Sequence, residues 1–116
     1  IQTVLMGGEI RPGYFSIGGD IAIKCLSEIR AEKGFLATDG WDLEGTYNAS
    51  MFEVGVKRAI IKSSLKTYLI ADHTKFGKIG FIKVSDLEEF EEIITDKPLP
   101  EDVTKNLEER GIKIIF

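Results

Sequence analysis

The fold class is decided by residues 33–72, KGFLATDGWDLEGTYNASMFEVGVKRAIIKSSLKTYLIAD. Two runs in this stretch, Lys33–Thr38 and Thr67–Ala71, have the length and composition of buried strands. Between them the sequence predicts an acidic, glycine-containing loop at 39–45 and then a helix over about Met51–Ser64. A strand, a helix and a second strand in this order predict a parallel pair of strands with the helix packed across them.

The start of this helix carries a capping signal. Ser50 is followed three residues later by Glu53. This is the spacing of a capping box, in which each of the two side chains bonds to the backbone N–H of the other residue. We therefore expect Ser50 to cap the helix.

Alternating strands and helices continue on both sides of this unit. A helix is expected from Asp20 onward, and a last helix is expected between Pro100 and Gly111. The additional expected strands are Thr3–Met6, Phe81–Val84, Glu92–Thr95 and Ile112–Ile115. The sequence thus predicts one α/β domain over residues 1–116, built as a twisted, mostly parallel sheet flanked by helices.

Composition excludes several classes of protein. The 116 residues are 43% hydrophobic and 29% charged, a balance that favours one compact domain with a core. No apolar run approaches the roughly 20 residues of a membrane span, so we expect a soluble, cytoplasmic protein without membrane contact. The only cysteine, Cys25, excludes an internal disulfide and a cysteine-based zinc site. The net charge of -4 argues against this segment itself binding DNA.

The first expected strand, Thr3–Met6, begins almost at the first residue, with nothing ahead of it to pack. We therefore expect the chain to be a fragment of a larger domain. Removing the first strands and helix of such a domain would uncover apolar sheet surface, and another chain tends to bury such surface. A homo-oligomer is the expected consequence.

Candidate ligand-binding residues follow the expected strands, because ligands of open parallel sheets bind beyond the carboxyl ends of the strands. Arginine and lysine suit an anionic group, and carboxylates accept hydrogen bonds from hydroxyls, so the set suits a polyhydroxylated anion. The candidates are Gly7, Gly8, Arg11, Asp39, Gly40, Asp42, Glu53, Lys57, Asp72 and Lys75.

Each candidate also has a purely structural interpretation. Gly7 and Gly8 are equally suited to turning the chain, and Asp39 begins an Asp-Gly pair of the kind that forms turns. Glu53 and Lys57 are spaced as a surface ion pair worth about 0.2 to 0.5 kcal/mol. No GxGxxG motif, phosphate-binding loop or calcium loop is present, so neither a cofactor nor a metal is expected.

Five segments in order resemble the effector-sensing domain of DeoR-type bacterial transcriptional repressors. They are VLMGGEIRPG, FLATDGWDLEG, FEVGVKRAII, LIADHTKFG and IITDKPLP. The resemblance implies a Rossmann-like fold similar to ribose-5-phosphate isomerase and glucosamine-6-phosphate deaminase. It also implies a phosphorylated sugar as effector, and DNA binding only through an amino-terminal winged helix-turn-helix that would precede this segment.

Three functions follow as hypotheses. The first is a sensing module of carbohydrate metabolism, in which a sugar phosphate shifts the populations of repressor states without reacting. The resemblance marks Gly7, Gly8, Arg11, Asp39, Gly40, Glu53, Lys57, Asp72 and Lys75 for that role. The second is an isomerase-like enzyme, in which Asp39, Asp42, Glu53 and Lys57 would transfer protons beside a sugar carbonyl. The third is an oligomerisation module.

Overall fold

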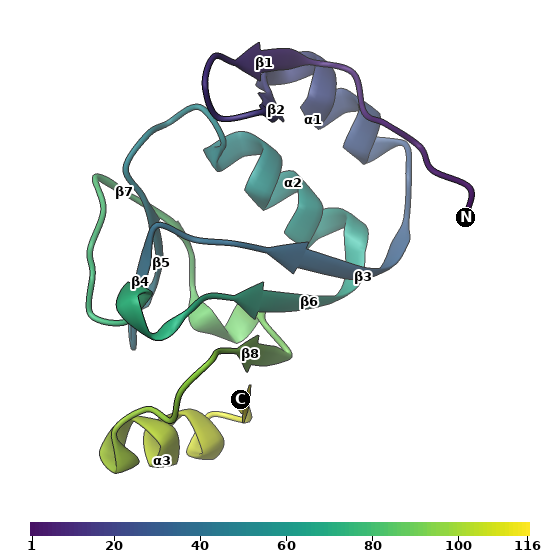
Figure 1. Cartoon of the computed structure of the whole chain (residues 1–116). Coiled ribbons are helices and arrows are strands. Elements are labelled where there is room, and N and C mark those ends of the chain that lie inside the picture. The colour runs from purple at the N-terminus through teal and green to yellow at the C-terminus, as the bar shows by residue number, and fades with distance from the viewer.

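The computed structural model describes all residues from 1 to 116. Its main sheet has four parallel strands in the order β3-β6-β8-β9. The strands are β3 (Ala31–Leu36), β6 (Ser64–Ile70), β8 (Glu92–Ile94) and β9 (Lys113–Ile115). The order follows the chain without reversal, as Figure 1 shows for the labelled strands. The expected α/β class with a mostly parallel sheet is confirmed.

Two helices, α2 (Val54–Ser63) and α3 (Glu101–Glu109), cover one face of this sheet. Helix α1 (Gly19–Ser27) packs against α2, on the side away from the sheet. A side chain on Gly34 of β3 would meet Ile60 of α2, so this face of β3 packs against α2. Leu69 and Ile93 share that face by register and join one core with Leu107 of α3. Right-handed crossovers that always move in one direction along a sheet put their helices on the same side.

The core lies between this face and the covering elements. Its ten buried members are Leu36, Trp41, Leu69, Ala71, Leu87, Phe90, Ile93, Val103, Leu107 and Ile112. Two short 3-10 turns, η1 (His73–Lys75) and η2 (Leu87–Glu89), follow β6 and the strand β7 (Ile82–Ser85). None of the three helices combines the length and the apolar character that crossing a membrane requires.

Residues 39–45, expected to be a loop, contribute instead to a second sheet. Strands β4 (Gly40–Asp42), β5 (Gly45–Asn48) and β7 (Ile82–Ser85) pair antiparallel in the order β4-β5-β7. The Asp42 carboxylate accepts hydrogen bonds from the backbone N–H groups of Glu44 and Gly45, at 2.8 and 3.2 Å, and so closes the β4–β5 turn. The strand expected near 81–84 exists, but it belongs to this sheet.

The expected strand Thr3–Met6 is wrong. Residues 1–6 have no regular structure, and Val4 and Leu5 are 74% and 83% exposed, because no strand of either sheet lies beside them. The chain instead forms a hairpin of β1 (Glu9–Arg11) and β2 (Ser16–Gly18). In Figure 1 this hairpin lies next to α1, above the amino end of α2.

The expected capping box is also wrong. Helix α2 begins at Val54, with Glu53 rather than Ser50 in the capping position and no side-chain cap. The Ser50 hydroxyl accepts a hydrogen bond from the Phe52 N–H at 3.1 Å, in the turn before the helix. The Glu53 carboxylate instead accepts a hydrogen bond from Ser16 in the β1–β2 hairpin. This tertiary contact replaces the local cap that the spacing predicts.

Candidate functional site

A cleft of about 290 Å³ lies where β3 ends, between β2 and the first turns of α2. We call this the β3 cleft. Leu36, Val56 and Ile60 give it apolar walls. Its polar lining consists of Ser16, Thr38, Asp39, Glu53 and Lys57. Three of these five, Asp39, Glu53 and Lys57, are residues that the sequence singled out.

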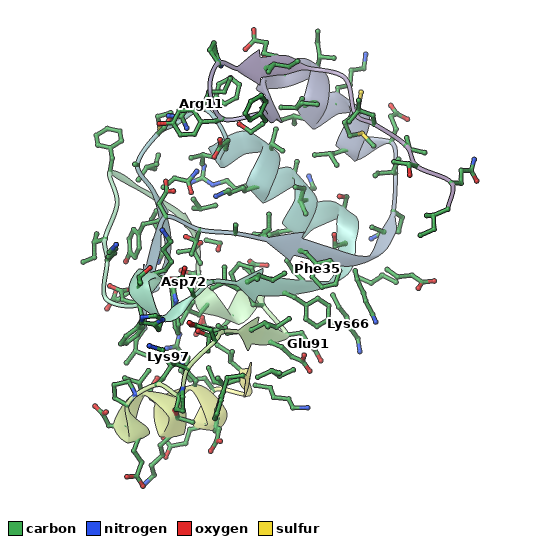
Figure 2. All side chains as sticks on the ribbon, viewed as in Figure 1. Arg11, Phe35, Lys66, Asp72, Glu91 and Lys97 are labelled. Atoms are coloured by element: carbon green, nitrogen blue, oxygen red, sulfur yellow. The ribbon has the colours of Figure 1, made fainter.

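Glu53 joins the hairpin to α2. Its Oε1 accepts a hydrogen bond from the Ser16 hydroxyl at 2.7 Å and lies 3.6 Å from Nη1 of Arg11. The Arg11 guanidinium also stacks on the Tyr14 ring, 3.6 Å from its centroid. Figure 2 places Arg11 above the amino end of α2, on the side of the molecule toward which β3 runs. The cleft therefore has an arginine at its edge, held by a carboxylate and an aromatic ring.

Lys57 lies inside the cleft. Its Nζ donates a hydrogen bond to Oδ1 of Asn48 at 2.8 Å, and Asn48 is only 1% exposed. Burial lowers the pKa of Lys57, and the charges of Glu53 and Asp39 oppose that effect. A partly desolvated ammonium attracts an anion more strongly than a hydrated one, because fewer waters compete for its protons.

Asp39 and Gly40 form the turn from β3 into β4. Asp39 Oδ2 accepts a hydrogen bond from the Ala49 N–H at 2.8 Å. The Thr38 hydroxyl donates to the Gly40 carbonyl at 2.7 Å and is 7% exposed. A Cβ on Gly40 would collide with the Lys78 carbonyl, so Gly40 is required for backbone packing. Asp39 thus reaches the cleft from a fixed turn.

The remaining expected residues do not line the β3 cleft. Asp42 directs its carboxylate to the β4–β5 turn and accepts from the Tyr47 hydroxyl at 3.2 Å. Asp72 caps η1 and accepts from the N–H of Thr74 at 2.8 Å and from its hydroxyl. These two bonds hold the pKa of Asp72 below its ordinary value. Lys75 lies in η1 and is not the residue that Asp72 contacts.

Gly7 and Gly8 do not line the β3 cleft. A Cβ on Gly8 would collide with the Gly18 carbonyl and with Ala22 of α1. Gly8 also has a φ of 150°, which residues with a side chain rarely adopt. A Cβ on Gly7 would touch only Ile21. Gly8 therefore lets the hairpin pack closely on α1.

The family model described as DeoR C terminal sensor domain matches residues 1–97. The chain belongs to the DeoR family. A regulator described as that of the sgc region in Escherichia coli K12 is 38% identical over 100% of this chain and 45% of the relative. The glycerol-3-phosphate regulon repressors of E. coli K12 and Haemophilus influenzae are 31% and 33% identical, over 97% and 99% of this chain and 45% of each relative.

This DeoR sensor segment spans less than half the length of those relatives. Another relative, from H. influenzae, is described as an HTH-type transcriptional regulator and is 32% identical over 95% of this chain. The relatives are therefore transcriptional regulators. The resemblance noted from five motifs is confirmed as family membership.

Sequence reasoning missed three polar residues of the DeoR segment's cleft region, Ser16, Thr38 and Asn48. Ser16 and Asn48 reach Glu53 and Lys57 only because the β1–β2 and β4–β5 hairpins fold toward α2. The sequence interpretation contained neither hairpin, so it gave no reason to place these residues together. Thr38 carried a weak signal, since it ends a predicted strand directly before Asp39.

Proposed function

We propose that this DeoR segment binds a phosphorylated sugar in the β3 cleft and that binding controls DNA recognition by a helix-turn-helix region elsewhere in the polypeptide. One observation carries the proposal. The cleft places the partly desolvated ammonium of Lys57 beside two carboxylate side chains, those of Asp39 and Glu53. Cations bind the phosphate, and carboxylate oxygens accept hydrogen bonds from sugar hydroxyls.

The size of the cleft and its edge support a small anionic ligand. A volume of about 290 Å³ lies near the lower end of the range of small-molecule sites, roughly 300 to 1,000 Å³. Arg11 sits at the edge, where its planar guanidinium can bind two phosphate oxygens at once. The carboxylate of Glu53 at 3.6 Å keeps this arginine in place without occupying all of its donors.

Sensing is favoured over catalysis. The isomerase hypothesis requires four residues to transfer protons beside a sugar carbonyl, and Asp42 is one of them. Its carboxylate is engaged with Glu44, Gly45 and Tyr47 and does not line the cleft. Glu53 is held by Ser16 and Arg11 rather than left free to act as a base. The relatives are transcriptional regulators, and we infer that this segment also acts by binding and not by turnover.

The phosphate should decide binding. We expect glycerol 3-phosphate, ribose 5-phosphate or another sugar phosphate from a panel to raise the melting temperature of the chain, because a ligand that binds only the folded state stabilises it. At 100 times its Kd such a ligand adds about 2.7 kcal/mol. The unphosphorylated sugars are the matched ligand controls. Absence of a shift with every sugar phosphate would overturn the proposal.

Variants locate the binding. Lys57→Ala and Arg11→Ala should each weaken the binding of that sugar phosphate about 10- to 100-fold, because a hydrogen bond to a charged group contributes about 1.5 to 3 kcal/mol. Lys62→Ala is the control, since Lys62 is exposed on the same helix and does not line the β3 cleft. Calorimetric titration measures the three affinities. Equal weakening by Lys62→Ala would show attraction by charge alone, without a defined site.

We further propose that the chain works as a homo-oligomer. The support is its set of exposed large apolar side chains, among them Phe35, Leu65 and Phe81, at 56%, 67% and 78% exposure, because such side chains tend to be buried by another chain where they gather.

A further inference from the structure

Glu53 is a counter-ion of both cations that we assign to the phosphate. Its Oε1 lies 3.6 Å from Nη1 of Arg11. Burial lowers the pKa of Lys57, and the charge of Glu53 is the largest influence that opposes this lowering. The side chains of Arg11 and Glu53 are only 27% and 22% exposed, so water and salt screen their attraction incompletely. A carboxylate of the chain itself therefore competes for the cations that a phosphate would bind.

The same carboxylate fastens the β1–β2 hairpin to α2. Glu53 Oε1 also accepts the hydrogen bond from the Ser16 hydroxyl at 2.7 Å, so it contacts β1 through Arg11 and β2 through Ser16. The hairpin is a two-stranded sheet of its own and pairs with neither of the other two sheets. Two-stranded hairpins are marginally stable alone, so this one depends on its contacts with the helices.

The base and the tip of the hairpin are held in different ways. At the base, Gly8 packs so closely on Ala22 of α1 that a Cβ would collide with it. Toward the tip, Tyr14 and Phe15 are 63% and 94% exposed. The polar contacts of hairpin side chains with α2 are the two contacts with Glu53. The position of the tip relative to α2 therefore depends on Glu53.

A phosphate is a stronger partner for Arg11 than Glu53 is. A phosphate monoester carries a charge of about −1.5 to −2 at pH 7 and three acceptor oxygens, whereas a carboxylate has one charge and two oxygens. The planar guanidinium can bind two phosphate oxygens at once, while its contact with Glu53 joins one nitrogen to one oxygen. A phosphate on Arg11 and Lys57 would also lie against the Glu53 carboxylate, and like charges repel strongly where water is partly excluded. The two anions therefore compete for Arg11.

We propose that the phosphate of the effector replaces Glu53 as the counter-ion of Arg11, so that the hairpin becomes attached to α2 through the effector. Lys57 lies four residues, or about one helical turn, beyond Glu53 on α2. Its ammonium uses one donor on Asn48 and has others for a phosphate. The exchange thus moves the attachment of the hairpin by about one turn of α2. Each counter-ion favours one of two arrangements of the hairpin, and the effector shifts the population toward its own.

This inference rests on the proposed function, because it requires phosphate binding in the β3 cleft. It adds the structural change that binding causes. The tests use inorganic phosphate alongside the sugar phosphates. Inorganic phosphate has no sugar hydroxyl that Glu53 could bind, so a change in its affinity reports on the charge of Glu53 at Arg11 and Lys57.

The first test measures affinity. Glu53→Gln removes the charge and keeps an oxygen for the Ser16 hydroxyl, so it should tighten the binding of inorganic phosphate at least about tenfold in calorimetric titrations at constant ionic strength. Glu28→Gln is the matched control, since Glu28 is exposed and outside the cleft, and it should leave the affinity unchanged.

The affinities separate this inference from the proposed function. Phosphate binding that Glu53→Gln weakens or leaves unchanged would overturn the inference and leave the proposed function standing, as would equal tightening by Glu28→Gln. If neither the parent chain nor Glu53→Gln binds phosphate or any sugar phosphate, both fail.

The second test follows the hairpin by amide hydrogen exchange. Glu53→Ala removes both contacts, so the amides of β1 and β2 should exchange faster than in the parent chain, while those of β6 stay unchanged and show that the variant is folded. Saturating phosphate should restore protection of the hairpin in Glu53→Ala, because phosphate then joins Arg11 to Lys57. It should restore none in Arg11→Ala/Glu53→Ala. Hairpin amides that ignore Glu53→Ala would refute the inference, as would phosphate that protects neither variant or both equally.

Discussion

At the scale of single residues, the position of Lys57 depends on Asn48. The buried Asn48 carboxamide accepts the Lys57 hydrogen bond at 2.8 Å. Asn48→Ala would leave a partly buried ammonium without an acceptor, and we expect it to lower the free energy of unfolding by about 1 to 3 kcal/mol. Asn106→Ala is the control, because Asn106 accepts a longer bond, 3.3 Å, from Arg110 and is only half-buried. Urea unfolding measures both variants, and an equal loss would contradict a special role for Asn48.

The same residues show what the sequence could predict about the site. Asp39 and Lys57 could be found, because one directly follows a predicted strand and the other lies on a predicted helix. The contacts of Glu53 could not. Local spacing assigned Glu53 to a cap with Ser50 and an ion pair with Lys57, whereas its carboxylate bonds to Ser16 and lies near Arg11. Those contacts span 37 and 42 positions of sequence, and only the folded hairpin supplies them.

At the scale of elements, the β1–β2 hairpin depends on Gly8. A side chain there would meet the Gly18 carbonyl and Ala22, at a φ of 150°. We expect Gly8→Ala to cost roughly 2 to 4 kcal/mol, from strain and overpacking together. Gly13→Ala is the control, because Gly13 also has a positive φ, 80°, but has open space around a Cβ, and it should cost only about 1 kcal/mol. Denaturant unfolding compares the two, and equal costs would show that close packing of Gly8 is unimportant.

Elements with a clear apolar pattern were predicted, and the two hairpins were not. Strands β3 and β6 and helices α1 and α3 lie within a few residues of their expected places. The β1–β2 and β4–β5 hairpins consist of strands of three or four residues, and β2, β4 and β5 each contain a glycine, a residue typical of turns. Thr3–Met6 has the composition of a strand, but a strand also needs a neighbour to pair with, and this segment pairs with no strand of the fold.

At the scale of the whole molecule, Arg110 connects elements that are distant in sequence. From the end of α3 its guanidinium donates to the Leu43 carbonyl in the β4–β5 turn at 2.7 Å and to the Glu88 carboxylate in η2. The bond from Arg110 is the main reason that the pKa of Glu88 is lowered. Hydrogen bonds from Thr74, Lys83 and His73 likewise lower the pKa values of three further exposed carboxylates, those of Asp72, Asp86 and Asp96.

These lowered pKa values predict how stability depends on pH. A carboxylate whose pKa is lower in the folded chain stabilises the fold above its unfolded pKa, about 4, and that contribution is lost as the pH falls through the folded pKa. We therefore expect the free energy of unfolding to be constant from pH 7 to about pH 5 and to fall below about pH 4. Glu88→Gln should make this fall shallower, whereas Glu109→Gln, on the exposed surface of α3 and in no ion pair, should not. Urea unfolding at several pH values tests this, and an unchanged acid slope in Glu88→Gln would show that the Arg110 contact does not form in solution.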